Sequence, residues 1–246
     1  MLYDMHAHMG SARERAVRKE AGIVTLLCAT CPPEAEQLRA LVEGEDLLLP
    51  TYGLHPWHTD AYRAEDMLPY FGQGVCVGEI GLCSAWCSVP LDVQQRAFEL
   101  QLDAAASTGK PVILHTKGEE ARIARIIRPY RLPFIVHWYS CPEHLDAYLE
   151  QDCYFTVGPD VERNAAVQAL ALRAPLSRLL IETDGFQAVL WAEGAETGEE
   201  RMLPLVLART IRAIARLRKA EEAEVRAAIA ANSALLIERG RGAGPV

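Results

Sequence analysis

The chain has 246 residues, of which 50% are hydrophobic and 24% are charged. This balance is close to that of an average soluble globular protein and excludes a disordered chain, a collagen and a coiled coil. Twenty-five Lys and Arg residues against 33 Asp and Glu residues give a net charge of -8, so the molecule as a whole repels polyanions. Any contact with nucleic acid must therefore be local or assisted by a metal ion.

The N-terminal segment MLYDMHAHMG lacks the basic and apolar stretches of a signal peptide, and no apolar run approaches the roughly 18 residues that span a bilayer. A cytoplasmic protein with no membrane contact is therefore expected. The seven cysteines favour reduced thiols over a disulfide framework in a chain of this kind. The C-x-x-C spacing of Cys28 and Cys31 arises easily by chance, and both thiols are expected to be structural.

Eight short apolar runs recur along the chain, with helical stretches between them. Most of the runs lack a polar alternation, as expected of parallel strands that are covered on both faces. They lie at residues 2–8, 23–29, 48–54, 75–82, 111–115, 134–139, 154–158 and 179–184.

The segments between the runs carry apolar residues at helical spacing, as in 92–109 and 119–131, and further helices are expected over 203–219 and 221–238. Eight strand and helix units in about 220 residues predict a TIM barrel that forms a single domain over 1–246, with a doubly wound open sheet as the alternative. Residues 185–204 show no periodicity and are expected to form a long loop that serves as a lid or binds a ligand. A frayed tail is expected over 240–246.

Six ionisable residues share one position in this pattern, the carboxyl end of a predicted strand. In a barrel these ends meet at one mouth, where catalytic residues are built. Four imidazoles and two carboxylates at one mouth suit one or two divalent ions such as Zn²⁺, Mn²⁺, Co²⁺ or Fe²⁺, and this nitrogen-rich set disfavours Mg²⁺ alone. The six residues are His6, His8, Glu79, His115, His137 and Asp184.

The motifs DMHAH, GLHP, GEIGL, PVILHT, VHWYS and ETD occur in this order across essentially the whole chain. In them the sequence resembles the TatD-type metal-dependent hydrolases of the amidohydrolase-like superfamily. The resemblance implies a TIM barrel with a two-metal hydrolytic centre that cleaves phosphodiester bonds in DNA. It makes Glu79 a bridging ligand, with His6, His8 and Asp184 completing one metal site and His115 and His137 completing the second.

Two metal ions about 3.5–4 Å apart can activate a water molecule and stabilise charge on the attacking and leaving oxygens. Asp184 is then expected to orient that water or to accept its proton, and Glu79 to act beside it as the bridging carboxylate. His55 matches a family histidine on the substrate side, which predicts a contact with a phosphate oxygen. The alternative for His55 is a cap on the turn before Pro56.

Two segments near the predicted mouth, those that carry Lys117 and Arg201, depart from the family pattern. Lys117 stands in HTKGEE where an arginine is common, and Arg201 is kept in RMLP without the usual asparagine. Both are expected to bind substrate, although an ammonium grips phosphate less specifically than a guanidinium. This departure leaves two alternatives open, namely hydrolysis of a small ester, lactone or amide at the same centre, and a non-catalytic metal-binding sensor or partner protein.

The four tryptophans lie on or near predicted strand ends and loops of the same face. Each is expected to be a packing residue, although together they could line an apolar part of the pocket. They are Trp57, Trp86, Trp138 and Trp191, and the remaining histidines, His58 and His144, are expected at the surface.

Overall fold

The computed structural model describes residues 1–243 and contains one sheet of eight parallel strands in the order β1 to β8. The sheet closes where Ala7 forms a bridge with Asp184 and the Asp184 N–H donates to the His6 carbonyl at 3.0 Å. A consecutive order with closure is that of a TIM barrel, which is confirmed, whereas a doubly wound sheet would reverse its strand order. The strands are β1 (Leu2–His8), β2 (Ile23–Ala29), β3 (Leu48–Tyr52), β4 (Cys76–Gly81), β5 (Val112–His115), β6 (Phe134–Val136), β7 (Tyr154–Val157) and β8 (Leu179–Ile181).

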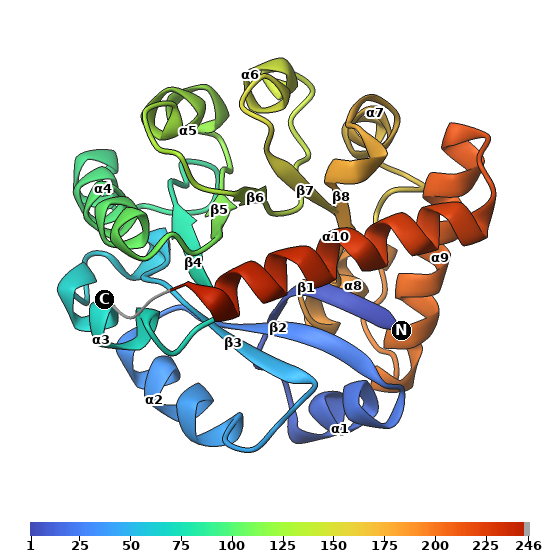
Figure 1. Cartoon of the computed structure of the whole chain (residues 1–246), viewed down its shortest axis with the longest axis horizontal. Coiled ribbons are helices and arrows are strands. Elements are labelled where there is room, and N and C mark those ends of the chain that lie inside the picture. The colour runs from blue at the N-terminus through green and yellow to red at the C-terminus, as the bar shows by residue number, and fades with distance from the viewer. Residues whose placement is uncertain (244–246) are drawn as a thin grey trace.

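The helices form a ring around the strands, as Figure 1 shows. The α-helices are α1 (Ala12–Glu20), α2 (Pro32–Leu41), α3 (Leu68–Phe71), α4 (Leu91–Thr108), α5 (Glu120–Ile127), α6 (Leu145–Leu149), α7 (Ala165–Arg173), α8 (Phe186–Glu193), α9 (Leu203–Arg218) and α10 (Glu222–Gly242), and the short 3-10 helices are η1 (Pro56–His58), η2 (Ala64–Met67), η3 (Leu176–Arg178) and η4 (Glu200–Met202). No helix in the part of the chain that the structure describes is both long and apolar enough to cross a membrane.

The barrel interior is filled in layers, because alternate residues of a strand point to the same side. Ile113, Ile135 and Leu180 belong to a buried apolar cluster that also includes residues of α10. Two residues further along the chain, at or just beyond the strand ends, the same side carries His115, His137 and Glu182, which are likewise buried. A polar layer at the carboxyl ends of the strands therefore packs directly on an apolar layer inside the barrel.

Several strands end earlier than the sequence pattern predicts. Strand β6 ends at Val136, so His137 follows the strand instead of lying within it, and Asp184 lies three residues beyond the end of β8. In both places side chains replace the ladder partners of the backbone. The Trp138 N–H donates to the Thr156 hydroxyl at 2.9 Å, and the Thr183 N–H donates to Asp4 Oδ1 at 2.8 Å.

The segment 185–204 is not the long loop that its lack of periodicity suggests. It contains α8 and η4, and the apolar side of α8 packs with α9 in a small cluster of Phe186, Val189, Leu190, Leu203 and Val206. Helix α8 ends at Gly194, which adopts a left-handed φ of 66°. Helix α5 also differs from its prediction, since it stops at Ile127, two residues before Pro129, which cannot continue a helix.

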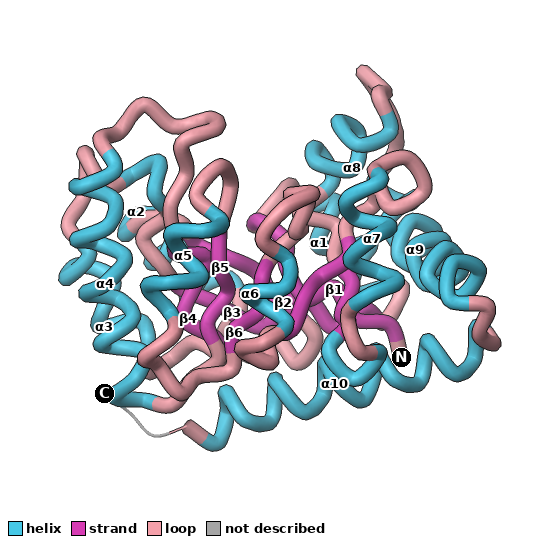
Figure 2. The backbone as a smooth tube through the Cα atoms, turned by 90° about the horizontal axis from the view of Figure 1, so that it is seen from above, coloured by secondary structure: helices cyan, strands magenta, loops and turns pink. Residues whose placement is uncertain are grey.

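The last helix, α10, lies across the end of the barrel opposite the carboxyl ends of the strands (Figure 2). Leu236 and Ile237 of α10 join the apolar cluster inside the barrel. The helix runs to Gly242, so the predicted tail is helical over its first three residues and Ala243 caps the helix, and the part of that prediction at 244–246 lies outside the described residues. Gly240 is buried, and α10 comes so close to Val75, the residue before β4, that a Cβ on Gly240 would lie 1.9 Å from the Val75 carbonyl oxygen.

This close approach predicts that Gly240→Ala destabilises the barrel by about 1–3 kcal/mol, because α10 must move away from Val75. Gly242→Ala is the matched control, since a Cβ there meets nothing within 4 Å, and it should leave stability within about 0.5 kcal/mol of the wild type. Urea unfolding followed by circular dichroism measures both. Equal stability of the two variants would contradict the packing assigned to α10.

Candidate metal centre

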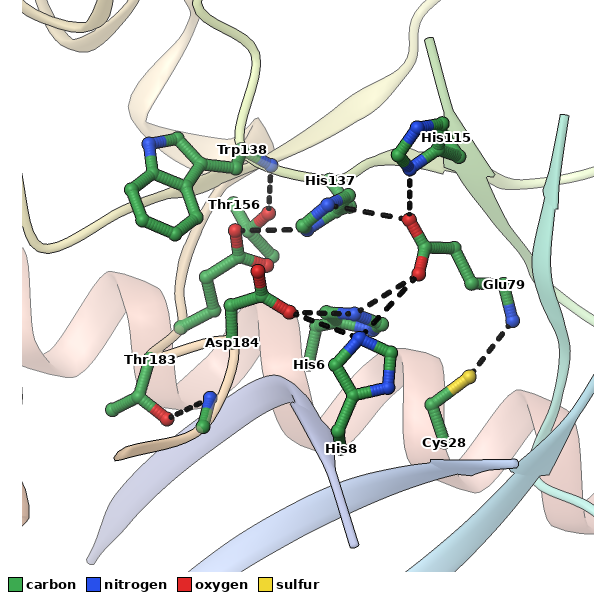
Figure 3. A network of polar contacts seen from close by, with 12 residues as sticks. His6, His8, Cys28, Glu79, His115, His137, Trp138, Thr156, Thr183 and Asp184 are labelled. Carbon is green, nitrogen blue, oxygen red and sulfur yellow. Dashed lines mark hydrogen bonds and ion pairs between the residues drawn. The ribbon is translucent and has the colours of Figure 1, made fainter. Parts of the chain in front are cut away.

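The six residues at the predicted strand ends meet in one cluster, and the buried carboxylate of Glu79 lies at its centre (Figure 3). Glu79 Oε1 lies 2.6 Å from His115 Nδ1 and 3.3 Å from His137 Nε2. Glu79 Oε2 lies 3.5 Å from His6 Nε2 and 4.0 Å from His8 Nε2. One carboxylate therefore faces four imidazoles that come from three different strands or strand ends.

Asp184 faces the same two histidines from the opposite side. Its Oδ1 lies 3.3 Å from His6 Nε2 and 3.4 Å from His8 Nε2. Three groups of side chains offer ligand atoms within 4.8 Å of one another and could each hold a metal ion. These groups are His6, His137 and Asp184; His6, His8 and Glu79; and His55, Glu79 and His115.

Backbone contacts bring Glu79 and His115 side by side. Gly81 of β4 has a φ of 152°, and a Cβ on it would lie 2.0 Å from the His115 carbonyl oxygen, so only glycine permits this approach of β4 to β5. The Glu79 N–H donates to the Cys28 thiol sulfur at 2.9 Å. Cys28 is therefore a structural residue beneath the centre, as the sequence predicts, and Cys31 is likewise a buried free thiol.

Glu182 is a site residue that the sequence analysis did not identify. Its Oε1 lies 3.1 Å from Nδ1 of His137, whose Nε2 faces Glu79. A carboxylate on the far nitrogen of a histidine fixes the ring orientation and raises its basicity toward a metal. The available signal was the spacing in ETD, because an acid two residues before Asp184 projects into the same barrel interior.

Asp4 and Arg18 form a buried pair beside the segment that carries Asp184. Arg18 Nη1 donates to Asp4 Oδ2 at 2.5 Å, and both side chains are fully buried. The Thr183 N–H donates to Asp4 Oδ1 at 2.8 Å, so this pair holds the chain immediately before Asp184. Arg18 Nη2 also donates to Thr183 Oγ1 at 3.0 Å.

The chain immediately after Asp184 is held by the same guanidinium through Glu14. Arg18 Nη2 donates to Glu14 Oε1 at 3.0 Å, and that oxygen accepts the Phe186 N–H at 3.1 Å. Asp184 has a φ of 60°, a left-handed conformation that is uncommon outside glycine. The contacts on both sides of Asp184 hold the backbone in this conformation and aim its carboxylate at His6 and His8.

The charges at the centre favour an ionised carboxylate among protonatable imidazoles. Burial alone would raise the pKa of Glu79, but the surrounding histidines hold it well below its usual range. Burial would likewise raise the pKa of Asp184, but the close approach of the His6 imidazole, 3.3 Å away, together with the other nearby imidazoles lowers it to about 2. In return, although burial lowers their pKa values, the Glu79 charge raises the pKa of His115 to about 9 and that of His6 well above 6.5.

His55 and Lys117 line the cavity above this cluster, which has a volume of about 540 Å³. His55 Nε2 lies 3.7 Å from Glu79 Oε2 and 3.2 Å from His115 Nδ1, within reach of the predicted ligands. His55 Nδ1 also accepts the Trp57 N–H at 3.2 Å, so the alternative role as a turn cap is present as well. The Lys117 ammonium is buried and donates to the Trp138 carbonyl and, at 3.2 Å, to the Ser140 hydroxyl.

Arg201 is placed away from the cavity. Its side chain is 75% exposed, pairs with Glu199 at 2.5 Å, and is absent from the described residues that line the cavity. His144 is exposed as expected, whereas His58 is half-buried and lines the cavity, contrary to its expected place at the surface.

The donor set fits divalent metal ions. Among the described residues, buried atoms without a hydrogen-bond partner include His6 Nε2, His115 Nε2 and Asp184 Oδ1. Buried polar atoms are rarely left unsatisfied, and two of these three, His6 Nε2 and Asp184 Oδ1, face one another across 3.3 Å. A cation between nitrogen and carboxylate ligands would satisfy both atoms.

The buried pair predicts that Arg18→Met lowers the free energy of unfolding by about 3–5 kcal/mol, because it leaves the Asp4 carboxylate buried without its cation. Arg13→Met is the control, because Arg13 pairs with Glu20 at the exposed surface and contributes less than about 1 kcal/mol. Urea unfolding of the metal-free protein measures both. A loss below about 1 kcal/mol in Arg18→Met would refute the positioning role of this pair.

The raised pKa values predict that metal binding releases protons. At pH 7 the metal-free centre keeps His115 and His6 protonated, whereas a metal ligand must be neutral imidazole. Affinity for Mn²⁺ should therefore rise between pH 6 and 8, by about tenfold per pH unit for each proton released. Calorimetric titration in two buffers with different ionisation heats counts these protons. His144→Ala should release the same number, and a heat that is independent of the buffer would contradict the prediction.

The family model described as TatD related DNase matches residues 3–238 of the chain. The 3'-5' ssDNA/RNA exonuclease TatD of Edwardsiella piscicida is 37% identical over 164 residues, a match that spans 61% of this chain and 62% of that protein. The protein with the same description from Pantoea ananatis is 31% identical over 192 residues, spanning 71% of this chain and 73% of that protein.

Solved structures show the same fold. The TatD homologue YJJV from Escherichia coli has a TM-score of 0.81 at 23% identity and covers 96% of this chain and 97% of its own. A TatD family hydrolase from Entamoeba histolytica has a TM-score of 0.73 at 14% identity, with coverage of 96% and 97%. The match of this family model to nearly the whole length of the chain shows that the chain belongs to the TatD-related DNase family.

Proposed function

We propose that the protein is a divalent-metal-dependent nuclease that hydrolyses phosphodiester bonds in single-stranded DNA or RNA. The observation that carries this proposal is the convergence of Glu79, Asp184 and four histidines on one cavity at the carboxyl mouth of the barrel. The relatives named as 3'-5' exonucleases support the substrate class and suggest removal of nucleotides from the 3' end.

The proposed centre holds two divalent ions bridged by Glu79. His6, His8 and Asp184 would complete one site, while His115 and His137 would complete the other. His55 stays on the substrate side in this proposal, although it lies within reach of Glu79. The predominance of nitrogen ligands suits Zn²⁺, Mn²⁺, Co²⁺ or Fe²⁺ better than Mg²⁺ alone. When bound, the ions would supply an activated water and stabilise charge on the attacking and leaving oxygens.

Asp184 is the residue proposed to orient the attacking water and to accept its proton. Its side chain is 19% exposed, so one part of the carboxylate reaches the cavity while Oδ1 faces His6 and His8. A pKa lowered to about 2 keeps this carboxylate ionised at neutral pH, so its oxygens can accept hydrogen bonds from the water that it is proposed to orient. The contacts of Asp4, Arg18 and Glu14 with the flanking backbone keep that carboxylate aimed at the centre.

Two cavity residues are proposed to contact the phosphate. Burial holds the pKa of His55 well below its usual range, so its imidazole is neutral. Because Nδ1 accepts the Trp57 N–H, the ring proton lies on Nε2, where it can be donated to a phosphate oxygen. Lys117 adds positive charge from beneath, although its ammonium is already bonded to the Trp138 carbonyl. Arg201 has no role in this proposal, because its side chain lies outside the cavity.

We place this activity in the cytoplasm, acting on DNA or RNA without a membrane partner. All seven cysteines are free thiols, in keeping with a reducing compartment. The nuclease reading is preferred over hydrolysis of a small ester, lactone or amide because of the family match, and over a non-catalytic sensor because the ligand set is complete.

Purified wild-type protein with Mn²⁺ should release nucleotides from single-stranded DNA, and Asp184→Asn should lower that rate by about 10²- to 10⁴-fold, because the variant cannot accept the proton. Asp92→Asn, at an exposed ion pair with Arg96, should be fully active. Elemental analysis establishes how much metal each protein retains.

Three outcomes discriminate the functions. If an Asp184→Asn protein that retains its metal cleaves DNA at the wild-type rate, Asp184 is not the proton acceptor. Metal-loaded wild-type protein that cleaves small esters or amides but not DNA would replace the nuclease with the small-substrate hydrolase. Tight metal binding with no turnover of either class would favour the sensor.

A further inference from the structure

Four tryptophans line the cavity above the metal centre, and three of them are largely exposed to solvent. The exposed fractions are 47% for Trp57, 59% for Trp86 and 69% for Trp191, while Trp138 is only 5% exposed. Large exposed apolar surfaces gathered around one hollow usually mark a binding site rather than a core. Each of these residues was expected to serve for packing, which fits the buried Trp138, while the alternative that the four line the pocket together fits their place around the cavity.

On one side of the mouth, Trp138 anchors Trp191. The Trp138 indole N–H donates to Asp160 Oδ1 at 2.8 Å, and the ring lies over Gly158, where a Cβ would come within 2.5 Å of the indole nitrogen. Trp191 of α8 meets this fixed ring edge to face, with ring centroids 5.8 Å apart and an interplanar angle of 74°. A rigid indole therefore supports a second indole whose surface remains open to the cavity.

On the other side, Trp57 is held against the metal centre. It follows His55, and its ring meets the His55 imidazole edge to face at 5.1 Å. Trp86 belongs to the segment after β4, which the Ser84 N–H ties to the Lys117 carbonyl at 3.0 Å. Both tryptophans are thus attached to backbone that is itself fixed to residues of the centre.

The strand order places these two groups across the mouth from each other. Trp57 and Trp86 follow β3 and β4, whereas Trp138 and Trp191 follow β6 and β8. In a closed barrel of eight strands in consecutive order, β3 and β4 lie opposite β7 and β8. The aromatic surfaces therefore flank the position of the metal centre.

The cavity offers little positive charge to a polyanion. Lys117 is the one Lys or Arg among the described residues that line it, and its ammonium is buried against the Trp138 carbonyl, while Glu34 and Asp160 add negative charge. Three of the four arginines of α9 line a separate cavity, where Arg209 and Arg216 are paired with Glu162. With a net charge of -8, the protein does not gather a nucleic acid by attraction of its phosphates.

We propose that Trp57 and Trp191, with Trp86 also lining the cavity, stack on the last unpaired bases of a single strand and so place the terminal phosphodiester at the metal centre. Indole faces stack on all four bases, so this clamp recognises unpaired ends without reading sequence. A paired end is disfavoured because presenting its bases singly to the two indoles costs both unpairing and unstacking energy. The inference rests on the proposed nuclease function and names the residues that bind the strand.

Steady-state cleavage of an oligothymidylate by the Mn²⁺-loaded protein tests the clamp. Trp57→Ala and Trp191→Ala should each raise KM by about 5- to 150-fold, the range for loss of one stacked base, while kcat stays near the wild-type value. Trp191→Phe, which keeps an aromatic face, should restore most of the KM. Leu205→Ala is the control, because Leu205 is 69% exposed and lies outside the cavity.

Two further measurements report stacking directly. An oligothymidylate whose two terminal positions lack bases should be bound by Asp184→Asn as weakly as the intact strand is bound when both Trp57→Ala and Trp191→Ala are introduced into that same background. The logarithm of Kd for the intact strand should change with the logarithm of salt concentration with a slope below about 1.4, equivalent to two single-strand phosphates.

The outcomes separate this inference from the proposed function. Wild-type KM in both alanine variants, or equal binding of intact and abasic strands, would overturn the clamp while leaving the nuclease in place. Absence of nucleotide release by the wild-type protein would overturn the nuclease and the clamp together. A steep salt dependence with unchanged alanine variants would assign strand binding to charge instead.

Discussion

The whole barrel is organised around one buried carboxylate, that of Glu79, which lies at the carboxyl ends of the strands. Removing the Glu79 charge from water is costly unless it is matched by cations or strong donors. The imidazoles that match it come from β1, β5 and the end of β6, so no local segment could supply them. Only a closed barrel brings those strand ends within 4 Å of one point, and the site therefore exists only when the whole sheet has formed.

The same constraint explains why the seam between β8 and β1 is so heavily bonded. This closure is made by the Asp184 N–H and the His6 carbonyl, both within residues of the proposed centre. Arg18, Asp4 and Glu14 reinforce it by holding the backbone on both sides of Asp184. Fold and chemistry are thus coupled at this seam, since the contacts that complete the barrel also orient the proposed proton acceptor.

Much of the fold was readable from the sequence, because buried parallel strands leave continuous apolar runs. The bounds of β1 and β2 match their predictions, whereas β6 and β8 are shorter, since Thr156 and Asp4 take over backbone donors at their ends. Helix α8 was missed because it is stabilised by packing against α9 rather than by a periodic pattern of its own. The six predicted site residues meet because the carboxyl ends of all strands in a barrel lie at the same mouth.

The supporting residues could not be read in the same way. Strict alternation along β1 would place Asp4 on the same face as His6, but a shift in register between Asp4 and Ala7 turns Asp4 toward Arg18 of α1. Glu182 looked like part of a motif whose chemistry Asp184 already explained. Trp191 lies in a segment that was expected to be a loop, so its support by Trp138 depends on a helix that the pattern did not reveal.

Helix α10 closes the far end of the barrel, so the cavity is open only at the mouth. Apolar side chains fill the barrel below the polar layer, and Leu236 and Ile237 cover its far end, so nothing can pass through the barrel. In the proposed function, a strand end enters the cavity and a released nucleotide leaves it through the same opening. The rest of a long strand stays outside the protein, so the length of the strand does not limit its entry. Each released nucleotide has to leave through this opening before the strand can move forward.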